Sequence, residues 1–472
     1  MIKITFNNNK AKIMGDQEPL NKLYKEFTVR HPQAFHIRSR NPHWDGHIHF
    51  LTERGYIPTG LLPILVKKLE EWEEEYEIED MREPVEWDSL SYRLAINGLR
   101  DYQVAAVKSI VLNRLGNAGI PFHRGIVNAA TNAGKTHIIM SLFNCFYDIK
   151  GLILLNNSQL FDQFLQDMPK FFPNPKDWGY LRGKQIRWGN LMVVMVQSLV
   201  KNLDRYPKQV SEFQAVFVDE CDLSDNKTYK KVLEKLYNTT IRVGLSGSIF
   251  TSTLAKDKLK NTSIKTFLGE EVYRISNKEL ISKKISVPII VKINNGNMRG
   301  GRESSYAEFY NKRITNNTER NTLILERIKY YLRQEIKPIL VMCQYHEHVD
   351  ILYQLIRDEL PDEITMGKIY HSLRDKETTL TLFKKGSIDV LISSLLIKRG
   401  QNMPLVKVII NASAGDSMAN VLQIVGRGTR THSSKTKTYI EDFYDFGVYL
   451  ESHSKHRLLT YKKEEFKIIK LG

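Results

Sequence analysis

The residues best suited to chemistry lie in one stretch, 129–136, which reads Ala-Ala-Thr-Asn-Ala-Gly-Lys-Thr. It follows a short apolar run, residues 125–127, and precedes a helix-like segment, residues 137–143. A loop between a strand and a helix can bind a phosphate group, because its backbone N–H groups and the helix N-terminus face the anion. Lys135 supplies an ammonium for the phosphates and Thr136 a hydroxyl for Mg²⁺, so the stretch predicts a nucleotide phosphate site.

Other residues near this loop are expected to contact the nucleotide. The usual phosphate loop begins with a glycine where this chain has Ala129, so the match is incomplete. Arg100 and Gln103 lie three residues apart at a predicted helix start and can meet an adenine edge, although an ordinary polar helix start is the alternative. The expected loop contacts are Thr131, Asn132, Ala133, Gly134, Lys135 and Thr136.

Two adjacent carboxylates follow the apolar run at residues 216–218. Hydrolysis of a nucleoside triphosphate needs one carboxylate to hold Mg²⁺ and another to orient and deprotonate water. We assign these roles to Asp219 and Glu220, with Thr136 as the second Mg²⁺ ligand. Two acids at a strand end can also be an ordinary loop start, but their position after a phosphate loop favours catalysis.

A pair of arginines, Arg427 and Arg430, lies far downstream of the carboxylates. Residues three apart on a helix share one face. Guanidinium groups in that arrangement suit a phosphate whose charge grows in the transition state, as an arginine finger does. A basic pair on the surface is the alternative.

The elements that must position these residues follow from apolar runs that alternate with helix-like segments, a pattern typical of parallel sheets. We expect two RecA-like α/β lobes, residues 91–285 and 286–472, behind a small α+β domain, residues 1–90. The strand candidates of the first lobe are residues 126–128, 152–155, 192–196, 215–218 and 241–245. Those of the second lobe are residues 287–291, 339–342, 368–370, 390–392, 406–410 and 438–440.

The composition favours a polyanionic partner. The chain of 472 residues has 69 Lys and Arg against 53 Asp and Glu, a net charge of +16, and such a balance suits nucleic acid, although a merely basic protein is the alternative. The three cysteines are widely spaced, which fits a reduced compartment. Because the chain contains no run of 18 apolar residues, we expect no membrane segment and a cytoplasmic location, in the host if a phage encodes the protein.

The domain at residues 1–90 contains a second candidate site. Arg38, Arg40 and Trp44 cluster around a turn that we predict between two strands, at residues 44–46. Arginines can hold phosphates, and an exposed aromatic ring can stack on an opened base. Trp44 can equally belong to the core of this small domain.

Taken in order, the motifs resemble those of the superfamily 2 helicases and translocases. The matching segments are residues 99–103, 129–136, 152–163, 196–199, 219–222, 245–248, 390–402 and 423–430. The resemblance implies that Gly400, Asn402 and Gln423 lie at the ATP site. It also implies that Gln197, Ser198 and Ser394 contact nucleic acid. The family commonly has an acid where Asn402 stands and a threonine where Ser394 stands.

Within the superfamily, residues 245–248 and the short N-terminal domain resemble the phage UvsW-type helicases, and more distantly the RecG and XPB helicases. This likeness implies an ATP- and Mg²⁺-dependent motor that remodels branched DNA, by fork regression or branch migration, in replication, recombination or repair. We expect a monomer.

Two other functions compete with this one. An RNA helicase is one, because Asp219–Asp222 differs by one residue from the Asp-Glu-Ala-Asp form, but a Ser-Ala-Thr motif is missing, which favours DNA. A nucleic-acid clamp gated by ATP is the other, and the intact Glu220 with its paired arginines argues against it.

Overall fold

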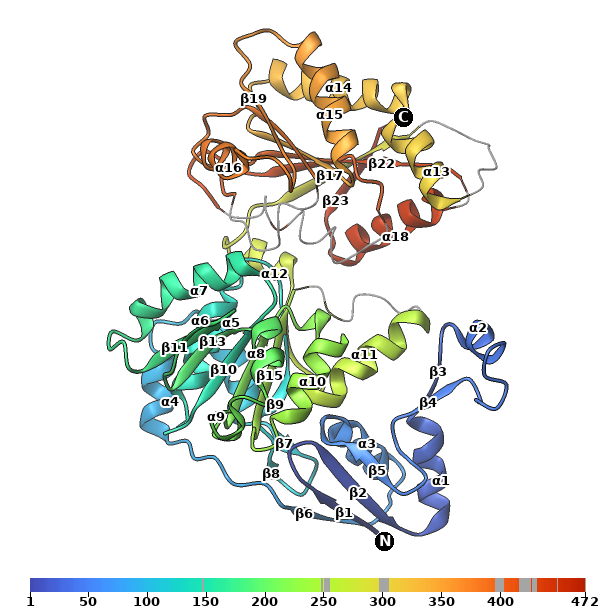
Figure 1. Ribbon diagram of the computed structural model, residues 1–472, viewed down its shortest axis with the longest axis vertical. Helices are drawn as coiled ribbons and strands as arrows, with labels where there is room; N and C mark the ends of the chain where they lie inside the picture. Colours follow the sequence, from blue (N-terminus) through green and yellow to red (C-terminus); the bar gives the residue numbers. More distant parts are fainter. Residues whose placement is uncertain are drawn as a thin grey trace. The chain divides into compact units, whose positions relative to one another are not determined.

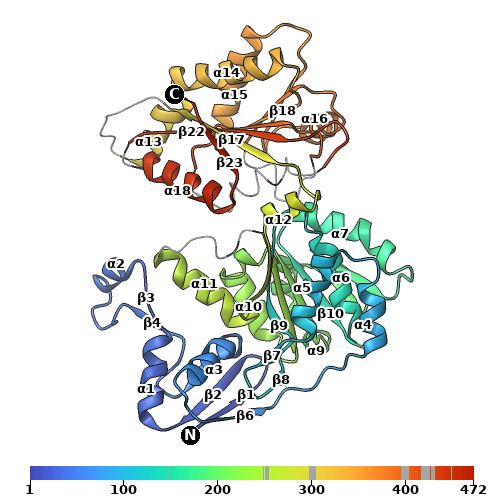
Figure 2. The same cartoon turned by 180° about the vertical axis from the view of Figure 1, so that it is seen from behind.

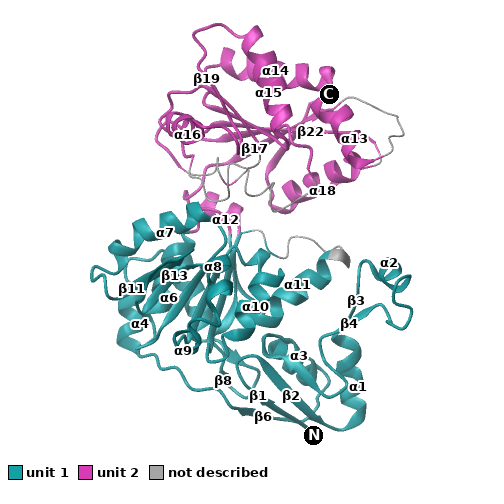
Figure 3. Ribbon diagram, viewed as in Figure 1, with its two compact units in different colours: residues 1–129, 134–275 teal, residues 130–133, 276–472 magenta. Residues whose placement is uncertain are grey.

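The computed structural model describes residues 1–146, 148–247, 249, 255–296, 305–394, 403–415, 426, 431–447 and 449–471. Contacts divide the chain into two compact units, the first with residues 1–129 and 134–275 and the second with residues 130–133 and 276–472 (Figure 3). Each unit contains a large sheet of mainly parallel strands, so the predicted fold class is confirmed. No helix in the described ranges has both the length and the apolarity that crossing a bilayer requires.

The large sheet of the first unit has the order β12-β11-β13-β10-β14-β15-β9-β16 in the described residues (Figure 1). Its strands are β9 (Arg124–Ala129), β10 (Gly151–Leu155), β11 (Trp178–Arg182), β12 (Gln185–Arg187), β13 (Leu191–Met195), β14 (Ala215–Asp219), β15 (Ile241–Ser246) and β16 (Glu271–Ile275). Apart from the β11–β12 pair, neighbouring strands are parallel. The central strands are buried along their whole length, as expected for a parallel sheet covered by helices on both faces.

Helices cover both faces of this sheet. They are α4 (Ser89–Ile96), α5 (Asp101–Val111), α6 (Lys135–Asn144), α7 (Ser158–Phe171), α8 (Val196–Asn202), α9 (Pro207–Ser211), α10 (Lys227–Lys235) and α11 (Ala255–Leu268). Helices α8, α10 and α11 bury Leu199, Val232 and Ile264 in one core with Val216 and Val218 of β14. This packing fixes the strand whose end carries the two carboxylates.

The N-terminal residues form a smaller sheet with the order β5-β2-β1-β6. Its strands are β1 (Ile2–Phe6), β2 (Lys10–Gly15), β5 (Tyr56–Pro58) and β6 (Tyr76–Asp80), with helices α1 (Gln17–Glu26) and α3 (Leu62–Glu71) and the 3-10 turn η1 (Thr59–Leu61). Ile2, Ile4 and Phe6 alternate into its core, as their spacing predicts. Short strands β7 (Arg114–Leu115) and β8 (Ile120–Pro121) follow in the chain and bring Leu115 and Phe122 into the same core.

The first turn of the chain, residues 7–9, docks on the part of the first unit that contains the large sheet. Asn8 Nδ2 donates to Tyr237 O at 3.0 Å, and Asn9 Nδ2 donates to Glu234 O at 2.8 Å. In return the buried Arg124 donates from Nη2 to Asn8 O at 2.8 Å. The N-terminal residues and the first lobe therefore share both hydrogen bonds and a core.

An arm extends from the N-terminal sheet, formed by β3 (Thr28–Arg30), α2 (Ala34–Arg38) and β4 (His47–His49). Strands β3 and β4 pair antiparallel, and Figures 1 and 2 show α2 at the end of the arm. The predicted turn at residues 44–46 does lead into β4, but a helix lies between the two strands. The connection is therefore longer than the hairpin that we expected.

The second unit contains a parallel sheet with the order β19-β20-β18-β21-β22-β17-β23 in its described part (Figure 2). The strands are β17 (Ile289–Asn295), β18 (Ile339–Cys343), β19 (Met366–Ile369), β20 (Val390–Ser394), β21 (Val408–Asn411), β22 (Thr438–Tyr444) and β23 (Lys467–Lys470). The helices are α12 (Asn277–Ser282), α13 (Tyr306–Tyr310), the π-helix η3 (Asn311–Thr315), α14 (Thr318–Arg333), α15 (His346–Glu359), α16 (Lys376–Lys384) and α18 (Leu450–Lys463). Helices α14 and α15 pack on one face, and α16 and α18 contribute to the cores of the other.

Candidate nucleotide site

Three neighbouring strands bring the candidate residues to one edge of the first sheet. Strand β15 lies between β9 and β14, and all three run parallel. The phosphate-loop residues follow β9, the carboxylates follow β14, and Ser246 ends β15. Because parallel strands end at the same edge, and ligands of open α/β sheets bind there, this edge is the natural site for a nucleotide.

The loop adopts a backbone that few residues other than glycine tolerate. Gly134 has a φ of 77° and directly precedes α6, and Asn132 has a φ of 76°. A Cβ atom at position 134 would lie 2.4 Å from Gln103 Nε2, so the loop needs glycine there and Gln103 lies against it. Gln103 is buried, and its Oε1 accepts the backbone N–H of Arg100 at 3.0 Å.

The other predicted loop contacts have different surroundings. Arg100 is exposed and donates from Nη1 to the Tyr102 hydroxyl at 3.1 Å. Residues 130–133, which include Thr131 and Ala133, belong to the second unit by their contacts, and Asn132 Nδ2 lies 3.4 Å from Ser286 Oγ there. Thr136 lies in the first turn of α6, where backbone N–H groups and the helix dipole favour an anion.

The charged groups of the loop and of β14 meet. Lys135 Nζ lies 3.0 Å from Glu220 Oε1 and 3.6 Å from Asp219 Oδ1. Burial would lower the pKa of Lys135, but the charges of Glu220 and Asp219 outweigh it and raise that pKa. Burial raises the pKa of the Asp219 carboxyl, although Lys135 opposes the shift. The site therefore holds a buried carboxylate whose charge needs a cation close by.

Glu220, the second of the two carboxylates, lies in a strained backbone conformation. Glu220 has a φ of 53°, a left-handed conformation that costs a residue with a Cβ atom about 1–3 kcal/mol. Its N–H donates to Asp219 Oδ1 at 3.0 Å, which stabilises the sharp turn after β14. Strain of this kind clusters at functional sites, because surrounding structure must hold it.

A further contact links β15 to the same turn, through two residues that are not among the predicted site residues. Ser246 Oγ donates to Asp222 Oδ1 at 3.2 Å, and both side chains are buried. The signal in the sequence is a small polar residue at the end of the strand between the two motif strands. The bond joins the end of β15 to the turn that carries Asp219 and Glu220.

The donor set fits a nucleoside triphosphate with Mg²⁺. The Thr136 hydroxyl and the Asp219 carboxylate are hard oxygen ligands, which Mg²⁺ prefers. Lys135 offers a positive charge at the start of α6, where backbone N–H groups also favour a phosphate. These residues would hold the metal and the phosphates.

The predicted nucleic-acid contacts in the lobes differ in exposure. Gln197 is exposed at the start of α8, and its Nε2 lies 3.5 Å from Asn156 O. Ser198 is buried, and its Oγ accepts the N–H of Gly183 at 2.7 Å. Ser394 is buried at the end of β20. Gly400, Asn402, Gln423, Arg427 and Arg430 lie outside the described residues.

On the arm, the exposed ring is not the predicted one. Trp44 is half-buried, donates from Nε1 to His47 O at 3.1 Å and packs edge-on against His31. Phe35, on α2, is 82% exposed, and Arg38 and Arg40 beside it are exposed too. Phe35 is not among the predicted contacts, although residues 28–44 contain aromatic and basic side chains and no acid.

Comparisons with known proteins find a family match in each of the two units. Residues 97–251 match the family described as "Type III restriction enzyme, res subunit", and residues 321–432 match the "Helicase conserved C-terminal domain". The "ATP-dependent DNA helicase uvsW" of Enterobacteria phage T4 is 26% identical over 92% of this chain and 91% of its own length.

A second relative and a solved structure extend the comparison. The Saccharomyces cerevisiae protein named "Putative ATP-dependent helicase IRC3" is 24% identical over 73% of this chain, and the match spans 51%, about half, of its length. The ATP-dependent Type ISP restriction-modification enzyme LlaBIII bound to DNA shares the fold, with a TM-score of 0.55, 13% identity, and coverage of 86% of this chain and 34% of that one. Helicase families of this kind use ATP with a divalent metal and couple its hydrolysis to unwinding. The two family matches and the phage relative place this chain in superfamily 2 of the helicases, as a homologue of T4 uvsW.

Proposed function

We propose that the protein is an ATP-dependent DNA helicase or translocase that remodels branched DNA, by fork regression or branch migration. The observation that carries the proposal is the convergence of Lys135 with Asp219 and Glu220 at the carboxyl edge of the first sheet. The likeness to a phage protein named as a DNA helicase, over nearly its whole length, supports DNA as the substrate.

In this proposal the residues of the site divide the work. Lys135 leaves the two carboxylates and pairs with the β- and γ-phosphates, while Thr136 and Asp219 hold Mg²⁺. The metal, when bound, neutralises charge on the phosphates. Glu220, released from Lys135, accepts a proton from the attacking water.

The second unit supplies the remaining groups. We assign Arg427 and Arg430 to the charge that develops on the γ-phosphate, and Gly400, Asn402 and Gln423 to ATP contacts. Residues 1–90, 91–285 and 286–472 would then act as a DNA-recognition domain, an ATP-binding lobe and a second motor lobe.

DNA is held mainly through its phosphates in this proposal. Arg38 and Arg40 of the arm bind the backbone, and Phe35 stacks on a base at a branch point. Gln197, Ser198 and Ser394 contact the strand along which the lobes move. The absence of acidic side chains in residues 28–44 supports the arm as the contact to a polyanion.

The decisive experiment compares ATPase rates with single-stranded, duplex and forked DNA and with single-stranded RNA, at one salt concentration. We expect the forked DNA to give the greatest stimulation. Greater stimulation by RNA would favour an RNA helicase. ATP binding without turnover on any of the four would favour a clamp.

A further inference from the structure

Residues 182–185 join β11 to β12 at one end of the large sheet of the first unit. We call these four residues the hairpin tip. Only Gly183 and Lys184 connect the paired strands, and Gly183 has a φ of 61°, which suits the first position of so short a turn. Apart from its chain neighbours, no described residue has a heavy atom within 4 Å of a Cβ atom placed on Gly183. All four residues are exposed, so the hairpin tip is open to a ligand.

The hairpin tip lies at the carboxyl edge of the sheet. Strand β11 runs parallel to β13, with Leu181 beside Val194. The N–H of Gly183 donates to Ser198 Oγ at 2.7 Å, and Ser198 belongs to α8, the helix that follows β13. Next to Ser198 is the exposed Gln197, a proposed contact of the nucleic-acid strand. Because neighbouring strands lie about 5 Å apart, the end of β11 is one such spacing beyond the end of β13 along this edge.

Side chains of both strands and of a helix fix the hairpin. The guanidinium group of Arg187, on β12, lies 3.9 Å from the ring centre of Trp178 and 5.4 Å from that of Tyr180, both on β11. Such cation–π contacts stabilise the pairing of the two strands. Arg182 Nη1 lies 2.6 Å from Asp162 Oδ1 on α7, which ties the hairpin tip to that helix. The hairpin tip therefore has a defined place beside α7 and α8.

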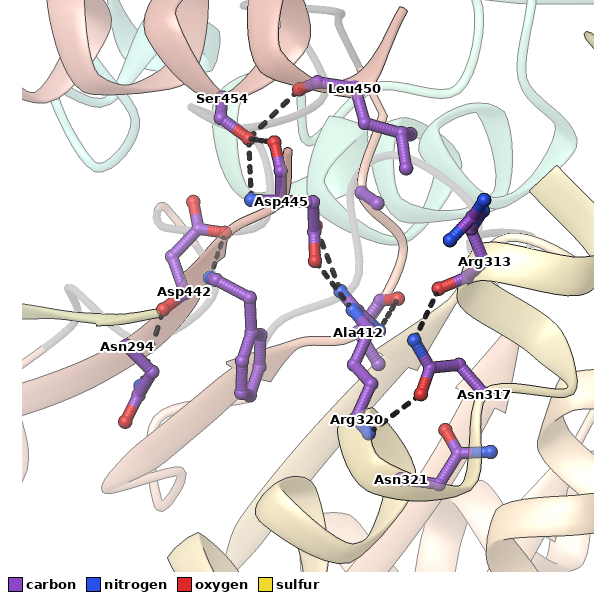
Figure 4. Close-up of polar contacts among 12 residues, drawn as sticks. Asn294, Arg313, Asn317, Arg320, Asn321, Ala412, Asp442, Asp445, Leu450 and Ser454 are labelled. Carbon is purple, nitrogen blue, oxygen red and sulfur yellow. Dashed lines mark hydrogen bonds and ion pairs between the residues drawn. The ribbon is translucent and has the colours of Figure 1, made fainter. Parts of the chain in front are cut away.

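The hairpin tip also carries a cation that no acid offsets. Residues 178–203 contain four basic side chains and no acidic one. Charges that shape the fold are paired: in the second unit, for example, the buried Arg320 donates from Nε to Asp445 Oδ1 at 2.8 Å (Figure 4). Lys184, in contrast, forms no ion pair within the described part of the chain. Its ammonium is exposed and available to an anion from outside the protein.

We propose that the hairpin tip binds the sugar–phosphate backbone of a nucleic-acid strand, with Lys184 as the phosphate contact. The hairpin tip offers two cations and an amide side chain but no aromatic ring, so it suits phosphates and not stacked bases. Ser198 has a positioning role in this contact, because its hydroxyl holds the residue next to Lys184. The inference rests on the proposed function in one respect, namely that a nucleic-acid strand passes Gln197 at the same edge.

Binding of a fluorescein-labelled oligothymidine to the full chain, measured by anisotropy at several salt concentrations, tests the contact. Lys184→Ala should weaken binding and make the plot of log K against log salt concentration shallower by about 0.7, the value for one phosphate of a single strand. Lys184→Arg keeps the positive charge and should retain the slope. Lys176→Ala is the matched control and should also retain it. Lys176 is exposed and without an ion pair among the described residues, but it lies before β11, at the opposite end of that strand.

A labelled strand of mixed sequence should show the same loss in Lys184→Ala, since a phosphate contact carries no base preference. The inference is overturned if Lys184→Ala retains the full slope, if Lys176→Ala lowers the slope equally, or if the loss depends on base sequence. A full slope in Lys184→Ala, beside ATPase activity that DNA stimulates, overturns this inference alone. ATPase activity that responds to no nucleic acid overturns the proposed function, whereas a shallower slope in Lys184→Ala would still support the contact.

Discussion

In the proposed mechanism, Lys135 exchanges its two carboxylate partners for the phosphates of ATP. Its ammonium is shared between Glu220 and Asp219, so one positive charge partly offsets the repulsion between two neighbouring acids. Under that proposal, phosphates and a metal would replace these contacts and free Glu220 to act on water.

Replacing Glu220 tests its role as proton acceptor. We expect Glu220→Gln to bind ATP with nearly unchanged affinity and to hydrolyse it at least about 10²-fold more slowly, because a positioned base contributes about that much. The readouts are fluorescent-nucleotide binding and steady-state ATPase. Glu212→Gln is the control, since Glu212 forms an exposed pair with Lys150 away from the loop. Turnover at the unsubstituted rate in Glu220→Gln would rule out the proposed role.

Arg430 is tested by its separate effects on turnover and on binding. Arg430→Ala should leave ATP affinity within a few-fold and lower kcat by roughly 10³, the low end for a lost arginine finger. Arg357→Ala removes an exposed arginine paired with Asp362 in the same unit and serves as the control. If Arg430→Ala weakened only nucleic-acid binding, with full kcat at saturating DNA, Arg430 would be a phosphate contact.

The sequence predicts the parts of the site that are local in the chain. Asp219 and Glu220 directly follow an apolar run, and Lys135 opens the helix after the loop that follows another, so these places at a strand end and at a helix start can be inferred from spacing alone. The Ser246–Asp222 bond joins residues 24 apart, and the Tyr310–Ser413 bond joins residues 103 apart. Nothing in the local pattern relates such partners, because the sheet order that brings them together is a property of the whole lobe.

At the scale of elements, the sequence predicts the strands that are apolar and buried, but it does not reveal the edge strands that carry charged residues. Strand β14 is continuously apolar before Asp219, whereas β16 and β23 carry charged residues and lie at the edges of their sheets. Strand β17 begins at Ile289 rather than at the predicted residue 287, since Pro288 lacks the N–H that a central strand donates. The arm escaped prediction because α2, a helix of 5 residues, is too short to show a period.

The arm offers a test of DNA recognition that leaves the motor lobes alone. We expect Phe35→Ala and the double variant Arg38→Ala/Arg40→Ala to fold normally and to keep ATPase activity on single strands. Their affinity for forked DNA should fall, the ring accounting for about 1–3 kcal/mol if it stacks on a base. The arginine variant should also show a shallower salt dependence.

Fluorescence anisotropy at several salt concentrations measures both effects. Lys22→Ala removes an exposed positive charge from α1 of the same unit and is the control for charge alone. An unchanged fork affinity in both arm variants would exclude the arm as the recognition element.

At the scale of the whole molecule, one buried histidine in each unit makes stability depend on pH. Burial lowers the pKa of His123 to about 4 and that of His348 to about 3. An unfolded chain binds these protons near the ordinary value of about 6.5. Stability is therefore complete above that pH and is lost as the pH falls toward the folded pKa values.

Between about pH 7 and about pH 5.5 each histidine should cost about 1 kcal/mol of unfolding free energy. Denaturation in urea at the two pH values measures the loss. Because glutamine does not titrate, His123→Gln and His348→Gln should each make the loss of unfolding free energy between the two pH values smaller by about 1 kcal/mol. An identical loss in the variants and in the unsubstituted protein would exclude the histidines as its source.

The asparagine turn at residues 7–9 binds the N-terminal domain to the large sheet's lobe in the first unit, so neither is structurally independent of the other. Without the N-terminal domain, Arg124 Nη2 would lose its acceptor, the carbonyl oxygen of Asn8. Leu115 and Phe122 would lose most of the core residues that they pack against. Deleting residues 1–90 would thus report on the integrity of the lobe before it reported on DNA. In evolution, we expect that the N-terminal residues cannot be exchanged between related proteins as an independent domain. They can be replaced only together with the surface of the lobe that fits them, so the two should have diverged as one heritable unit.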